Sequence, residues 1–192
     1  MLEIRHRASA VAALEKPNRE VIPDFIRVEL LVMQVRKILE IVALGSIVAN
    51  EKEYSEAYDK IEKHYHAKKI LRFVERINPD FYPKPVLHAK TGDSTHHLEW
   101  KSDKDGSYLT RKEFEKIYDR CGALMHAHNP YSKQKDYAKY ESSIREWMTK
   151  IEGLLHAHVI KLVNDSNYYL IHMNSPDGNP HGFVLSPMTD GI

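Results

Sequence analysis

The stretch DFIRVELLVMQVRKILEIVALGSIVAN, residues 24–50, decides the fold. Wound as a helix, it carries apolar side chains on nearly all sides, and it contains one glycine and no proline. This pattern predicts a long central helix that is buried on most of its circumference. Charged side chains interrupt the run and make it a poor membrane span: Arg27, Glu29, Arg36, Lys37 and Glu40. Because the N-terminus also lacks the apolar core of a signal peptide, the expected location is the cytoplasm, with no membrane contact.

Helical patterns continue along the chain on both sides of the 79–109 region. Three further helices are predicted at about 53–77, 111–127 and 134–164, each with apolar residues at three-to-four spacing. A capping box, Thr110-Arg-Lys-Glu113, marks the start of the second of these. Short connections between helices favour antiparallel neighbours, so the helices are expected to form a bundle.

The remaining segments predict short strands and a loose N-terminus. Residues 1–22 read as a loose or partly helical lead-in, because Pro17 and Pro23 close it. The predicted fold class is mainly α: a four-helix-bundle-like core with a small β-hairpin insertion at about 86–101 and a C-terminal β-hairpin at about 168–186. We expect a single domain over 1–192, with the helical core at about 24–77 and 110–164 and the β excursions at 79–109 and 166–192.

Composition excludes several classes of site. The formal net charge is +1, which argues against a generally basic, DNA-coating surface but leaves room for a local basic patch. A single cysteine, Cys121, excludes an internal disulfide and any cysteine-based zinc site. The chain is rich in histidine, with 12 residues.

The most function-like segment runs from Tyr118 to Tyr131. On a helical wheel the apolar stripe of the 111–127 helix centres near Cys121 and Met125. Arg120 and His126 fall on opposite sides of that stripe, about 120° apart, and are expected to be available to solvent or to a partner chain. Cys121 on the stripe reads as an inert core residue.

This segment resembles the signature of the HEPN superfamily, an arginine followed after four to six residues by a histidine on a late helix of a helical bundle. Here it reads Arg120-Cys-Gly-Ala-Leu-Met-His126, with five residues between the two. The resemblance covers about 24–77 and 110–164. It implies a bundle that dimerises so that two Arg/His motifs meet. Many members are metal-independent ribonucleases of toxin and antiviral-defence systems, and others act as binding or scaffold modules.

The chemistry of such a site accounts for these residue types. Metal-free RNA cleavage needs proton transfers, which suit histidine, and a cation on the developing phosphorane, which suits arginine. Because Arg120 and His126 diverge on one helix, a homodimer is expected to build each site from two chains. We also expect further residues to contact the RNA: His128, Asn129, Tyr131, Lys68, Lys69 and Arg72.

Two other interpretations stay open at this point. A metal site could form from distant histidines such as His88 or His97 with His172, although no metal motif is present and no cofactor is predicted. The second interpretation is a non-catalytic interaction or RNA-binding module, either dimeric or bound to an antitoxin-like protein, in which Arg120 and His126 serve structure. The sequence does not separate this module from the nuclease.

Overall fold

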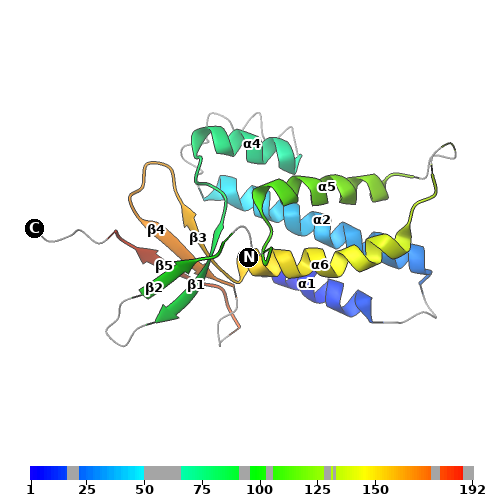
Figure 1. Ribbon diagram of the computed structural model, residues 1–192, viewed down its shortest axis with the longest axis horizontal. Helices are drawn as coiled ribbons and strands as arrows, with labels where there is room; N and C mark the ends of the chain where they lie inside the picture. Colours follow the sequence, from blue (N-terminus) through cyan, green and yellow to red (C-terminus); the bar gives the residue numbers. More distant parts are fainter. Residues whose placement is uncertain are drawn as a thin grey trace, which may run out of the picture.

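A computed structural model describes residues 1–16, 22–49, 66–90, 96–102, 106–127, 131, 133–173 and 178–187, without the side chains of residues 88–90, 96 and 97. These residues form five helices and one five-stranded antiparallel sheet, and the sheet lies at one end of the helices (Figure 1). The fold is therefore mixed α/β. The prediction of a mainly helical chain is confirmed, and the two predicted hairpins belong to one sheet with a further strand between them, so the sheet is larger than predicted.

Helix α2, Asp24–Val48, is the central element, as its sequence predicts. It contacts each of the other four described helices. Apolar residues on the opposite side, such as Leu44 and Val48, are exposed, so burial covers less of the circumference than predicted; the fully buried residues share one broad face. They include Leu31, Val32, Val35, Ile38, Leu39 and Ala43.

Helix α1, Leu2–Glu15, decides between the two predicted forms of the lead-in: it is helical over most of its length, not loose. Its second half is rich in alanine, which favours the helical backbone more than any other residue. Ile4 and Val11, two turns apart, bury their side chains against the rest of the helices. Pro17 and Pro23, on which the prediction rested, follow the helix and do not prevent it.

Helix α4, Ala67–Ile77, lies within the predicted 53–77 helix but begins after His66, an N-cap with extended backbone, so the prediction of one continuous helix is wrong at that residue. Residues 50–65 lie outside the described residues. It buries Ile70, Leu71 and Val74. Strands β1, Lys84–Lys90, and β2, His96–Trp100, follow as an antiparallel pair. The predicted hairpin insertion is thus confirmed.

Helix α5, Arg111–Met125, begins with the predicted capping box. The Thr110 hydroxyl accepts from the Glu113 amide at 3.3 Å, and the Glu113 carboxylate accepts from the Thr110 amide at 3.2 Å. The helix ends earlier than predicted, with His126 as its C-cap in an extended conformation. Met125, predicted as a core residue, is 45% exposed.

Helix α6, Tyr137–Leu155, also ends earlier than predicted, because a strand follows it at once. Strand β3, Ala157–Lys161, occupies the part of the sequence that had been predicted as the end of the helix. It pairs with β1 on one side and with β4, Tyr168–His172, on the other. Strand β5, His181–Leu185, completes the predicted C-terminal hairpin. The order β2-β1-β3-β4-β5 therefore joins both hairpins into one sheet through β3.

The segment before α5 anchors the sheet to the helices. The Leu109 amide donates to the Lys150 carbonyl of α6 at 2.8 Å. Gly153 of α6 lies so close to this segment that a Cβ there would come within 2.0 Å of the Ser107 carbonyl oxygen. Glycine is required at this point, since any side chain would occupy the space of the neighbouring backbone. Among the described residues, no helix is long and apolar enough to cross a membrane.

Candidate functional site

Arg120 lies on α5 against α6 and is less accessible than the sequence predicted. Its Nη2 donates to the Ser143 hydroxyl at 3.1 Å. The guanidinium carbon is 4.7 Å from the ring centre of Trp147 and 5.6 Å from that of Tyr140. The Tyr140 hydroxyl in turn donates to the Arg120 carbonyl at 3.1 Å. The prediction that Arg120 is open to solvent or a partner is corrected: α6 covers that side of α5, and the side chain is half-buried.

The side chain of His126 is more accessible to solvent than that of Arg120. It is exposed at the C-terminal end of α5. Lys135, which the sequence reasoning did not single out, donates from Nζ to the carbonyl of Leu124 at 2.7 Å and to that of His126. The last carbonyls of a helix have no partner within it, so a cation at this end is favourable. The sequence feature that could have pointed to Lys135 is the pair of lysines, Lys133 and Lys135, that follows the helix-ending Asn129-Pro130.

The predicted contacts beyond His126 are only partly described. Tyr131 is 97% exposed. The predictions for His128 and Asn129 lie outside the described residues.

The predicted basic contacts of α4 face α5 and are largely neutralised there. Lys68 donates to Asp119 at 2.7 Å, and Arg72 donates to Glu115 at 2.9 Å. The Arg72 hydrogen bond holds the pKa of the Glu115 carboxyl below its ordinary value, although burial opposes this. Lys69 is exposed. The basic residues of α4 thus bridge two helices, which reduces the positive charge they present to RNA.

On the other side of α5, its buried face contacts α2 through one arginine of α2, Arg36. Arg36 lies 4.0 Å above the ring centre of Tyr118 and donates to its hydroxyl at 2.6 Å. Gly122 makes room for it, since a Cβ there would be 3.0 Å from Arg36 Nη1. Burial raises the pKa of the adjacent Cys121 thiol to about 12, which confirms the interpretation of Cys121 as an inert core residue.

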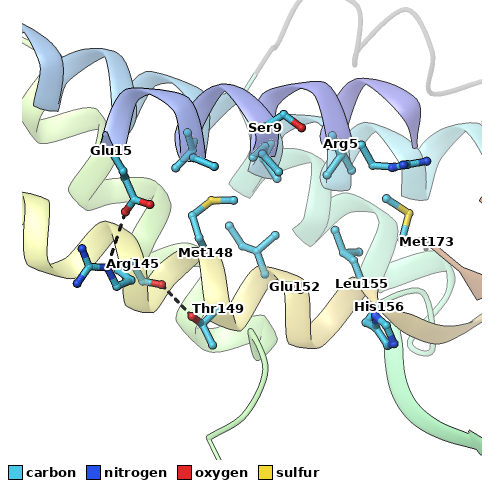
Figure 2. Close-up of a pocket in the computed structure, with 16 residues that line it drawn as sticks. Arg5, Ser9, Glu15, Arg145, Met148, Thr149, Glu152, Leu155, His156 and Met173 are labelled. Carbon is cyan, nitrogen blue, oxygen red and sulfur yellow. Dashed lines mark hydrogen bonds and ion pairs between the residues drawn. The ribbon is translucent and has the colours of Figure 1, made fainter. Parts of the chain in front are cut away.

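A groove of about 490 Å³ separates α1 from α6 (Figure 2). At one end of the groove, Arg145 Nε and Glu15 Oε1 are 4.0 Å apart. His156 and Met173 lie at its other end. Small residues of α1, such as Ser9, leave the space open. Neither Arg120 nor His126 lines the groove, because Arg120 packs on a different side of α6.

The histidines give no metal site in the part of the chain that the structure describes. No group of three His, Cys, Asp or Glu side chains there has the spacing to hold a metal ion. His158 is buried, and its Nδ1 bonds to the Leu155 carbonyl at 3.0 Å. Burial lowers the pKa of His158 to about 4, so the ring is neutral and serves the junction of α6 and β3.

The arrangement at the C-terminal end of α5 therefore offers one exposed imidazole, one half-buried guanidinium and one exposed phenol. A neutral or protonated imidazole can transfer protons near neutral pH. Comparison with models of known families, with curated proteins and with solved structures finds no match to this chain.

Proposed function

We propose that the protein is a HEPN-like, metal-independent endoribonuclease of the toxin or antiviral-defence type that acts as a homodimer in the cytoplasm. The observation that carries the proposal is the placement of His126, exposed at the end of α5 where a second copy can reach it. Arg120 precedes it on the same helix, in a bundle built around one central helix, as the resemblance to the HEPN superfamily implies.

The proposed reaction uses two copies of His126. One imidazole accepts the proton of an RNA 2′-hydroxyl, and the 2′-oxygen attacks the adjacent phosphorus. The bond from phosphorus to the 5′-oxygen breaks, and the protonated imidazole of the partner chain donates a proton to that oxygen. The products are a 2′,3′-cyclic phosphate and a free 5′-hydroxyl. The Arg120 guanidinium stabilises the negative charge that develops on the phosphorane.

Arg120 enters this scheme as a group that α6 holds in place. The Ser143 hydroxyl accepts a hydrogen bond from one guanidinium nitrogen, and the Trp147 ring lies against the guanidinium. Because these contacts already restrict the Arg120 side chain, the side chain loses less conformational entropy when it binds a phosphate. In this proposal Tyr131, which is exposed, stacks on an RNA base.

The test is cleavage of labelled RNA by purified protein with and without EDTA. We expect activity to survive EDTA and to fall at least about 100-fold in His126→Ala, because general acid and base catalysis contributes about 10²–10⁴-fold. The matched control is His156→Ala, another exposed histidine on the same chain. Arg120→Lys keeps a cation near Trp147 but loses the planar fork, so activity should fall while the protein stays folded.

Three outcomes would contradict the proposal. Equal activity in wild type, His126→Ala and His156→Ala would remove His126 from the reaction, and loss of activity in EDTA would favour a metal site. Light scattering that shows only monomer at working concentration would exclude the shared site.

One observation favours a second candidate, a non-catalytic interaction or RNA-binding module that engages RNA or an antitoxin-like protein. The predicted site cations already have partners within the chain: Arg120 with Ser143, Lys68 with Asp119 and Arg72 with Glu115. In this alternative they stabilise the contacts of α5 with α4 and α6. Binding of RNA without any cleavage would favour the module.

A further inference from the structure

A second pocket, of about 500 Å³, lies between the sheet and the start of α5. Trp100 of β2 is opposite Val86, two residues on from Lys84, so Trp100 and Lys84 point to the same face of the sheet. The same alternation through β3 places Tyr168 of β4 on that face. The register thus gathers an indole, a phenol and an ammonium group from three strands. A pocket of this volume is within the usual range of small-ligand sites.

Aromatic rings form much of the pocket wall. Trp100 is 53% exposed and Tyr168 is 39% exposed, and Lys161 Nζ lies 4.3 Å from the Tyr168 ring centre, so the indole offers the more open face. Tyr108 and Tyr82 lie deeper, and the Tyr82 hydroxyl donates to the Leu109 carbonyl at 3.0 Å, which holds its ring in place. Aromatic faces in such a position stack on nucleobases, whatever the base.

The charged residues that line the pocket are all cations: Lys84, Lys101 and Arg111. Lys84 pairs with Asp80 at 2.7 Å. Lys101 donates to the Gly153 carbonyl at 3.4 Å and has no ion pair among the described residues. Arg111 pairs through Nη2 with Glu115 at 3.0 Å and with Glu75 at 3.5 Å, and its buried Nε has no hydrogen-bond partner in the described part of the chain. An unsatisfied buried donor is unfavourable, and an anionic oxygen in the pocket would relieve it.

We propose that this pocket binds a nucleotide unit, a nucleobase stacked on Trp100 with its phosphate near Lys101 and Arg111. The unit comes either from a single RNA strand or from a free nucleotide. A cationic ligand such as a methylated lysine also suits aromatic rings, but no carboxylate is among the described residues that line the pocket to hold it. The proposal does not rest on the nuclease, because the pocket lies at the opposite end of α5 from His126, about 22 Å along the helix axis.

The experiment measures binding of fluorescent 2′-O-methyl oligonucleotides by anisotropy, with UMP, AMP and inorganic phosphate as competitors. The 2′-O-methyl group removes the hydroxyl that the proposed cleavage needs, so binding is measured without turnover. We expect Trp100→Ala to weaken binding at least about fivefold, the lower range for loss of one stacked base. Lys101→Ala should weaken binding and flatten its dependence on salt.

Matched controls lie outside the pocket. Phe25→Ala removes another exposed aromatic ring, from α2, and Lys112→Ala removes an exposed lysine beside Arg111. Both should bind as wild type does. Trp100→Tyr keeps an aromatic face and should restore most of the affinity, which a purely structural role of the indole would not predict.

The outcomes separate the sources of the ligand. Competition by UMP or AMP that depends on Trp100 supports a site for free nucleotides. Binding of the oligonucleotide alone, with the same dependence, supports a site for an RNA strand. Equal binding by wild type and Trp100→Ala would overturn the proposal, as would the absence of any binding. So would a loss of affinity confined to His126→Ala, since the RNA would then bind only at the other end of α5. If cleavage fails its own test, binding at the pocket is unaffected.

Discussion

The two ends of α5 differ in how the chain holds them. At the sheet end, backbone approaches backbone: Leu109 bonds to Lys150, and Gly153 meets Ser107 with no room for a side chain. The capping box and the Lys150–Glu113 ion pair at 2.5 Å complete this end. Such contacts hold in place the wall of the pocket of about 500 Å³ beside Trp100, the Trp100 pocket, without any ligand.

At the far end, single side chains hold the chain. Lys135 is the described link between α6's lead-in and the last carbonyls of α5. His126 and Tyr131 are exposed beyond it. The comparison teaches that backbone contacts preorganise the pocket at the sheet end, whereas the far end presents exposed side chains, which the proposed function assigns to a site shared with a second copy.

The largest expected effect tests the close approach at the sheet end. Gly153→Ala should destabilise the protein by about 3 kcal/mol, because overpacking displaces backbone rather than a flexible side chain. Urea unfolding measures the change.

Gly45→Ala on α2 is the matched control. No atom lies within 4 Å of a Cβ there, so alanine should stabilise the helix by about 0.5–1 kcal/mol. Similar effects at both glycines would show that the sheet end is not tightly packed.

The second prediction concerns pH and the junction of α6 with β3. His158 has a folded pKa of about 4, below its ordinary value, so the unfolded chain takes up the proton first as pH falls. Stability is then full above about pH 6.5, and falls by up to about 2 kcal/mol between pH 7 and pH 5. Urea midpoints at several pH values measure it.

His158→Asn should flatten this dependence, since an amide can still donate to the Leu155 carbonyl without titrating. His156→Asn, two residues earlier and exposed, should keep the pH dependence of the wild type. An unchanged slope in His158→Asn would assign the effect to other groups.

The third prediction removes the cap at the sheet end. Thr110→Ala should lower stability by about 1 kcal/mol, because the Glu113 amide loses its acceptor. Thr149→Ala, whose hydroxyl only donates back to the Arg145 carbonyl on an exposed face, should change stability by less than about 0.5 kcal/mol. Thermal melts of both variants give the comparison.

The smallest effect is expected at the far end. Lys135→Met should lower stability by about 0.5 kcal/mol, because one exposed cation leaves the carbonyls of a helix end. Lys133→Met, an exposed neighbour, should have no effect. A loss as large as that of Gly153→Ala would mean that both ends are held equally firmly.

The sequence predicted elements that local pattern determines. Helix α2 follows from its long apolar run without proline, and the capping box follows from the side chains of Thr110 and Glu113 alone. Strand β3 was missed because Ile151, Leu155, Val159 and Leu162 continue a helical spacing, and only pairing with β1 and β4 makes the strand favourable.

The candidate site shows the same limit. A helical wheel places Arg120 off the apolar stripe but contains no information on where α6 lies, so the contact with Trp147 could not be predicted. The Trp100 pocket draws residues from four separate segments, and no motif in the sequence connects them.

Cys121 gives the chain a built-in reporter of motion. It is the single cysteine, it is fully buried between α5 and its neighbours, and burial holds its pKa near 12, so the native thiol is both inaccessible and protonated. Alkylation can therefore proceed only through openings of the helical core, and its rate measures how often α5 separates from α2. A ligand or second copy that stabilises α5 would slow labelling of this one atom, whether or not any RNA is cleaved.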